Sequence, residues 1–259
     1  MDDKQSQYIK TNIIDRYSDS GRYFRGTYSG EGLKAIEKVK SNFPFRKNIS
    51  YRYYEPRSLH RYLLIGDRFR DYLGGKILDV GSRDNTIQTV LKKPCFLVDK
   101  NNPALPSFDW ENEALPYPDK SFDTVVCLDA LEHINDIHSG FRDLLRVSNQ
   151  YVIISLPNCW RKTLKQFIKG YGTSASYGLP PEKPHDRHKW FFNTEDIENF
   201  IFYNSYSAKF PFKVKAVVYH VPLTIPRHRI LYPLARFVLP ERHFKNFFVN
   251  TVFVCLEKT

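Results

Sequence analysis

The sequence predicts a doubly wound α/β fold built around a mostly parallel sheet. From Lys76 onward, short apolar segments alternate with segments of helical spacing, which is the pattern of consecutive βαβ units. The run Phe122 to Leu128 is almost continuously apolar, as expected for a strand that is covered on both faces. A chain of 259 residues is long enough for one large domain of this kind with additions.

The predicted elements can be placed in chain order. Two helices precede the sheet, over residues 31–39 and 58–72, and the second has apolar residues at helical spacing. Strands are predicted at 76–80, 96–99, 107–110, 122–128 and 151–155, with helices at 86–91 and 137–147. Asn193 or Thr194 is expected to cap a helix that runs to about residue 204. Strands at 213–219 and 251–256 complete the set.

Three segments depart from this alternation. Residues 1–60 are polar, basic and rich in tyrosine, and we expect an N-terminal extension that caps the binding pocket, followed by a domain at 61–259. The segment 156–190 contains many glycines and prolines and is predicted to be an irregular loop. The spacer 220–249 holds two short amphipathic pieces that Pro233 and Pro240 break. Both insertions are expected to act as lid or substrate-binding elements.

Composition limits the setting of the protein. The net charge of +11 favours anionic partners, which include a membrane surface, a phosphorylated substrate and nucleic acid. No apolar run is long enough to span a membrane, the first residues lack a signal peptide, and the four cysteines form no metal-type pair. We therefore expect a cytoplasmic protein. The basic, apolar-striped spacer is compatible with peripheral contact at the inner membrane surface or with a lid packed on the domain.

A candidate binding site lies where the first two strands of the domain end. The first strand carries Asp79 and leads into a small-residue turn at Gly81, and the second ends on Asp99, eighteen residues after that glycine. A turn before a helix N-terminus can hold an anionic or polar ligand, and an acid that ends the next strand can accept hydrogen bonds from ribose hydroxyls. Together they predict a site for a nucleoside cofactor.

Four segments, taken in order and with their spacing, carry a family resemblance. They are Leu78-Asp79-Val80-Gly81, Val98-Asp99, residues 111–119 (Glu-Asn-Glu-Ala-Leu-Pro-Tyr-Pro-Asp) and residues 122–134, which include Leu131-Glu132-His133. With them, residues 76–257 resemble a class I S-adenosylmethionine-dependent methyltransferase of the small-molecule, ubiquinone-pathway type. The resemblance implies a seven-stranded Rossmann-like sheet with an antiparallel last strand, and S-adenosylmethionine as the cofactor.

The resemblance also implies roles for individual residues. Asp79 would hold the turn or the cofactor ammonium, Asp99 the ribose, and Asp129 would lie near the methionine moiety. The remaining cofactor-binding residues are two in the turn and two expected at the adenine: Gly81, Ser82, Glu111 and Asn112. Arg83 and Asn85 stand where the family's motif has its second and third glycines. Asn85 can adopt a left-handed backbone, but the Arg83 side chain must point away from the pocket or lie over the cofactor carboxylate.

A hydroxyl acceptor would need a general base, and histidine is the usual choice. The candidates are His133, His185 and His188, for which packing or hydrogen bonding is the alternative role. Asp129, Glu132 and His133 would share a helical face able to hold a metal ion. We nevertheless expect no metal, because the Leu-Glu-His segment is common without one.

The sequence thus predicts methyl transfer to a hydroxyl of a small molecule or of a glycan- or lipid-linked intermediate. Two alternatives remain open. An RNA-modifying methyltransferase would suit the basic charge, although no RNA-binding module is present and a nucleic-acid partner is less expected. A non-catalytic cofactor-binding scaffold would explain Arg83.

Overall fold

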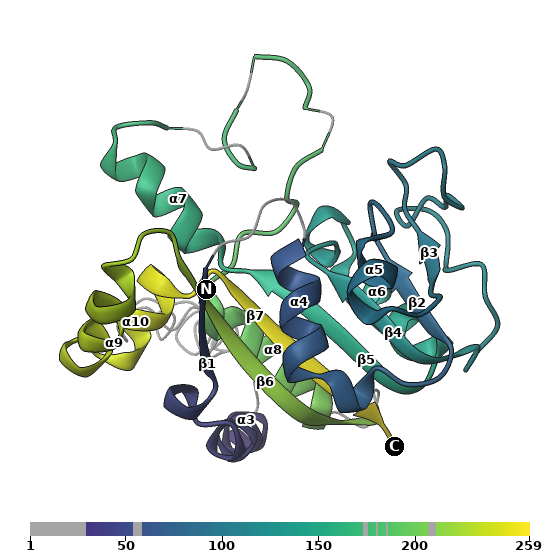
Figure 1. The fold of residues 1–259 in the computed structure, drawn as a ribbon, viewed down its shortest axis with the longest axis horizontal. Coiled ribbons are helices and arrows are strands. Elements are labelled where there is room, and N and C mark those ends of the chain that lie inside the picture. Colours follow the sequence, from purple (N-terminus) through teal and green to yellow (C-terminus); the bar gives the residue numbers. More distant parts are fainter. Residues whose placement is uncertain (1–29, 54–58, 173–175, 180, 185, 207–210) are drawn as a thin grey trace, which may run out of the picture.

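The computed structural model describes residues 30–53, 59–172, 176–179, 181–184, 186–206 and 211–259. In this part of the chain, seven strands form a single sheet in the order β1-β6-β7-β5-β4-β2-β3 (Figure 1). The strand β7 runs antiparallel to both of its neighbours, β5 and β6, and the other pairings are parallel. The predicted fold class, including the antiparallel last strand, is confirmed.

The strands are β1 Ile49–Tyr53, β2 Ile77–Val80, β3 Phe96–Val98, β4 Phe122–Leu128, β5 Ser148–Pro157, β6 Phe212–Leu223 and β7 Thr251–Lys258. The α-helices are α3 Gly30–Asn42, α4 Leu59–Arg68, α5 Thr86–Leu91, α6 Ile137–Val147, α7 Cys159–Ile168, α8 Thr194–Tyr206, α9 His228–Val238 and α10 Glu241–Phe248. Short 3₁₀ turns occur at η2 Phe45–Lys47, η3 Arg70–Tyr72 and η4 Leu131–His133.

Two apolar layers hold the helices against the sheet. On one face, residues of α4 and α5 such as Ile65 and Ile87 pack with Val126 and Phe253 of the strands. On the other face, α3, α6 and α8 pack against the sheet in a second buried cluster, to which Phe141 of α6 belongs. The strands are therefore covered on both sides, which explains why the central ones read as continuous apolar runs.

One predicted strand is wrong, and a different segment completes the sheet. Residues 107–110 form no strand, because the backbone turns there: the Asp109 carbonyl accepts hydrogen bonds from the backbone N–H groups of Asn112 and Glu113. The seventh strand is β1, whose Ile49 pairs with Tyr219 of β6 at the edge of the sheet. The sheet therefore extends into the residues that we assigned to the N-terminal extension.

The two insertions are more regular than expected. The loop 156–190 begins with the helix α7, and Pro233 lies inside α9 instead of ending it. Figure 1 shows α7, α9 and α10 grouped at the end of the sheet opposite β3. No helix in the described part of the chain combines the length and apolar character that crossing a bilayer requires.

Candidate functional site

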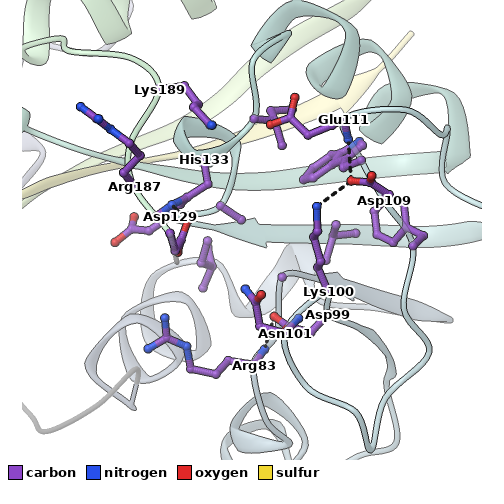
Figure 2. Close-up of a pocket in the computed structure, with 18 of the residues that line it drawn as sticks. Arg83, Asp99, Lys100, Asn101, Asp109, Glu111, Asp129, His133, Arg187 and Lys189 are labelled. Carbon is purple, nitrogen blue, oxygen red and sulfur yellow. Dashed lines mark hydrogen bonds and ion pairs between the residues drawn. The ribbon is translucent and has the colours of Figure 1, made fainter. Parts of the chain in front are cut away.

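A cavity of about 450 Å³ opens at the carboxyl ends of β2, β3 and β4. The chain passes from β2 to β3 on one side and on to β4 on the other, so the cavity lies where the strand order reverses, the usual ligand site of open α/β sheets. Figure 2 shows Asp99, Asn101 and Arg83 on one wall, and His133, Arg187 and Lys189 across from them. The second wall comes from η4 and from the long segment after β5.

The turn after β2 needs glycine at its first position. Gly81 has a φ of +74°, and a Cβ there would lie 2.7 Å from the Cβ of Ala130. Arg83 also adopts a left-handed backbone, with a φ of 59°, and its side chain is exposed. Arg83 thus has a conformation that glycine adopts more easily than other residues. Asn85, with a φ of −88°, does not adopt this conformation.

The carboxylate of Asp99 is oriented by the backbone on both sides. Its Oδ2 accepts a hydrogen bond from the Arg83 N–H at 3.0 Å, and its Oδ1 accepts one from the Asn101 N–H at 2.7 Å. The residue is only 8% exposed, yet it lines the cavity. Each carboxylate oxygen can accept a further hydrogen bond, so Asp99 presents a fixed acceptor to a ligand.

Asp79 and Ser82 lie behind the cavity wall. Asp79 is fully buried and accepts a 2.8 Å hydrogen bond from the hydroxyl of Tyr62, which itself lines the cavity. Burial raises the pKa of Asp79 to about 8. Among the described residues, neither the Oδ1 of Asp79 nor the Oγ of Ser82 has a hydrogen-bond partner.

Asp129 lies directly after β4, and both oxygens of its carboxylate have partners within the protein. Its Oδ1 accepts a 2.5 Å hydrogen bond from Ser155, and its Oδ2 forms an ion pair with Nε of Arg61 at 3.0 Å. Asp129 adopts a left-handed backbone with a φ of 49°. Both Asp129 and Arg61 line the cavity, and no sequence pattern pointed to Arg61.

The segment around residue 110 supplies an aromatic wall. Phe108 and Trp110 line the cavity with ring centroids 5.7 Å apart, and the Nε1 of Trp110 is buried with no hydrogen-bond partner among the described residues. Glu111 lines the cavity too, and its carboxylate accepts from the Asn135 N–H. Asn112 is not part of this lining, because it faces a neighbouring hollow and donates to Asp109.

The histidines occupy different depths. His133 lines the cavity, and its Nδ1 lies 2.8 Å from Oδ1 of Asp186. His188 lies behind it, with the two ring centroids 4.7 Å apart, and its Nδ1 is 2.8 Å from the hydroxyl of Tyr177. Next to both is Glu132, whose pKa is raised well above its usual range by burial and by the Asp129 carboxylate. His185 lies outside the described residues.

Comparison with known proteins gives one family match. Residues 98–154 match the model of a family described as a methyltransferase domain. Among curated proteins, none matches the chain.

Several solved structures are similar to this chain. A magnesium protoporphyrin IX methyltransferase from Synechocystis PCC 6803, solved with bound SAH, is 12% identical, with 99% of this chain and 100% of that one covered and a TM-score of 0.44. A possible histamine N-methyltransferase from Thermotoga maritima is 17% identical over 78% and 92% of the two chains, with a TM-score of 0.46. An S-adenosylmethionine-dependent methyltransferase from Methanosarcina mazei is 16% identical over 74% and 97%, with a TM-score of 0.47.

Proposed function

We propose that the chain is a class I S-adenosylmethionine-dependent methyltransferase, as the methyltransferase-domain match of residues 98–154 suggests, and that it methylates a hydroxyl of a small molecule or of a glycan- or lipid-linked intermediate. The observation that supports this most directly is the Asp99 carboxylate, held by two backbone donors at the wall of the cavity. In that position it can accept hydrogen bonds from the two hydroxyls of a ribose.

The other residues of the cavity fit the same cofactor. The aromatic wall of Phe108 and Trp110 suits the adenine ring, and the buried Nε1 of Trp110 offers a donor that no described residue uses. The guanidinium of Arg61 is a candidate partner for the carboxylate of the methionine moiety, on the side of the cavity where Asp129 lies. In this proposal Asp79 acts through Tyr62, which separates it from the cavity.

The residues around the second wall position the acceptor. When bound, the cofactor supplies an electrophilic methyl group: the acceptor oxygen bonds to that carbon while the electron pair of the broken carbon–sulfur bond stays on sulfur. Alignment of the two reactants and exclusion of water are the enzyme's main tasks. The acceptor hydroxyl must lose its proton beside His133, either to this histidine or to a group that it holds.

The charge of the second wall suggests an acceptor with negative charge. Lys183, Arg187 and Lys189 line the cavity, and Figure 2 shows Arg187 and Lys189 on the same wall as His133. Basic side chains in such a position attract phosphate or carboxylate groups. A phosphate-linked glycan or lipid intermediate meets this requirement. An RNA acceptor is the second candidate, and steeply salt-dependent binding to RNA would favour it.

A calorimetric titration of the Asp99→Asn variant tests the proposal. The variant keeps the size of the side chain but loses a charged acceptor, so we expect affinity for S-adenosylmethionine and for S-adenosylhomocysteine to fall about tenfold or more. Asp67→Asn is the matched control, because Asp67 is exposed in α4 and absent from the cavity lining. Unchanged affinity in a folded Asp99→Asn protein would remove Asp99 from the cofactor site.

A further inference from the structure

Three potential metal ligands converge beside the cavity. The Nε2 atoms of His133 and His188 lie 3.8 Å and 3.9 Å from the same carboxylate oxygen, Oε1 of Glu132. One ligand atom from each residue lies within 4.8 Å of the others. Bonds of about 2.0–2.2 Å to a shared ion would place the three ligand atoms roughly 3–4 Å from one another. The two imidazole rings therefore need to move closer together by about an ångström when an ion binds.

The backbone holds these residues together although they are far apart in the sequence. Glu132 and His133 belong to η4, directly after β4, whereas His188 belongs to the segment that follows the long loop. The N–H of Lys189 donates to the carbonyl of Glu132 at 2.8 Å, and Nε1 of Trp190 donates to the carbonyl of Ile134 at 3.0 Å. The two residues that follow His188 therefore tie it to main-chain carbonyls in and next to η4.

Both histidines are oriented in the way that metal-bound histidines are. In each ring the Nδ1 atom has an outer partner at 2.8 Å, Asp186 for His133 and the Tyr177 hydroxyl for His188. If Nδ1 carries the proton, the lone pair of each Nε2 points toward Glu132. An outer partner that fixes the tautomer and the ring in this manner is a regular feature of metal sites.

Glu132 provides an independent observation. Its side chain is 1% exposed, and its Oε2 has no hydrogen-bond partner among the described residues. An unsatisfied carboxylate oxygen in a buried position is costly unless a ligand satisfies it. A cation that the carboxylate binds through both of its oxygens would satisfy Oε2, while Oε1 faces the two imidazoles.

We propose that Glu132, His133 and His188 bind a divalent transition-metal ion at the wall of the cavity. Two imidazole nitrogens and one carboxylate are a donor set typical of zinc, iron and neighbouring first-row ions, whereas magnesium and calcium prefer oxygen ligands. Three protein ligands leave coordination positions open. The proposal departs from the expectation from sequence, which was that no metal binds. Asp129, considered there together with Glu132 and His133, is bound to Arg61 and Ser155.

The position of the site gives the ion a role in the proposed reaction. His133 lines the cavity, so an open coordination position beside it can face the acceptor oxygen. A hydroxyl bound to a divalent cation loses its proton far more readily than a free one. His133 is then a ligand through Nε2, and the proton passes to the Asp186 carboxylate, which His133 holds at the cavity wall. The binding site itself rests on the geometry and does not depend on the identity of the acceptor.

Cobalt(II) titration of the full-length, chelator-treated protein tests the proposal, because cobalt reports its ligands by visible absorption. We expect one cobalt ion per chain with ligand-field bands of a nitrogen and oxygen site. His133→Asn, His188→Asn and Glu132→Gln should each abolish these bands. Tyr177→Phe removes the outer partner of His188, together with the hydrogen bonds of this hydroxyl to Cys159 and to the Trp190 carbonyl, and should weaken binding by about ten- to a hundredfold.

His243→Asn is the matched control, because this exposed histidine of α10 lies outside the cluster, and it should bind cobalt like the unaltered protein. Circular dichroism of each variant separates loss of the site from loss of the fold. Absence of stoichiometric binding, equal binding in folded His133→Asn, or a spectrum dominated by thiolate charge transfer would each overturn the proposal. Titration with S-adenosylmethionine, in the presence and absence of cobalt, tests the cofactor site separately.

Discussion

At the scale of single residues, two of the four non-glycine residues with left-handed backbones in the described part of the chain lie at the cavity. Arg83 and Asp129 both have left-handed backbones, with φ values of 59° and 49°, and they lie on its two sides. Such a conformation costs a non-glycine residue roughly 1–2 kcal/mol. Each is held by contacts that also shape the site: the Arg83 N–H donates to Asp99, and Asp129 is tied to Ser155. The strain therefore accompanies the positioning of two carboxylates.

Replacing Arg83 by glycine should release this strain. We expect Arg83→Gly to raise the free energy of unfolding by about 1 kcal/mol, because glycine adopts φ values near 60° without a steric penalty. Arg83→Ala is the matched control, since it removes the same guanidinium but keeps the Cβ. Denaturant unfolding of the two variants measures the difference. Equal stabilities for glycine and alanine would show that the conformation is not strained.

Asp79 should make stability depend on pH. Burial raises its folded pKa to about 8, whereas the unfolded value is about 3.9. Between these values the unfolded chain releases the proton and the folded protein keeps it, so the free energy of unfolding falls as the pH rises from about 4 to 8. Asp79→Asn should remove this pH-dependent loss of stability. The gain in the free energy of unfolding should therefore be larger at pH 8 than at pH 5, and the difference between the two gains should be up to about 4 kcal/mol.

Unfolding curves of both proteins at several pH values measure this effect. The amide oxygen of asparagine can still accept the hydrogen bond from Tyr62, so the substitution mainly removes the buried charge. The exposed Asp67→Asn change provides the control for a general loss of negative charge. Stability curves that run parallel for Asp79→Asn and the unaltered protein would contradict the prediction.

Part of the site could be predicted from local sequence. Gly81, Asp99 and His133 line the cavity, because a strand end followed by a turn places them at one edge of the sheet; their roles stay predictions. Arg61, Tyr177 and Asp186 could not be found in this way. Arg61 and Asp186 are distant in the chain from their partners Asp129 and His133, and Tyr177 lies in the same irregular loop as its partner His188, where no periodic pattern predicts a contact.

At the scale of elements, prediction succeeded where the local pattern determines the structure. The helices α5 and α6 have the predicted bounds. The start of α8 was also found, because Asn193 caps it: its Oδ1 accepts from the N–H groups of Glu195 and Asp196, and Asp196 accepts from the Asn193 N–H in return.

The missed elements depend on partners that are distant in the sequence. The strand β1 is an edge strand with few buried residues, and its pairing with β6 joins segments about 170 residues apart. The helix α7 leaves Trp160, Phe167 and Ile168 exposed, so its apolar residues do not gather on one buried face. Residues 107–110 have the alternation of a strand, but Asp109 stabilises a turn there instead.

At the scale of the whole molecule, exposed apolar side chains gather at one end. The helices α7, α9 and α10 lie together there (Figure 1), and their exposed apolar residues are Trp160, Phe167, Ile168, Ile230, Leu231, Leu234, Phe237, Val238 and Phe247. Basic residues accompany them, including the exposed Arg227 and Arg229 at the start of α9. Apolar and basic side chains combined in this way fit an anionic membrane surface. A lipid-linked acceptor would be found at such a surface.

We therefore expect the protein to sediment with vesicles that contain phosphatidylglycerol and much less with neutral phosphatidylcholine vesicles. Arg227→Glu together with Arg229→Glu should weaken binding at least about tenfold, since each basic residue near an anionic surface contributes about 1 kcal/mol. Arg68→Glu with Lys213→Glu changes the net charge equally at exposed positions of α4 and β6 and is the matched control. Ile230→Ser with Phe237→Ser tests the apolar contribution without altering charge. The prediction is wrong if the α9 double variant and the control double variant bind the vesicles equally. The attraction to the membrane would then come from the overall charge of +11 and not from α9.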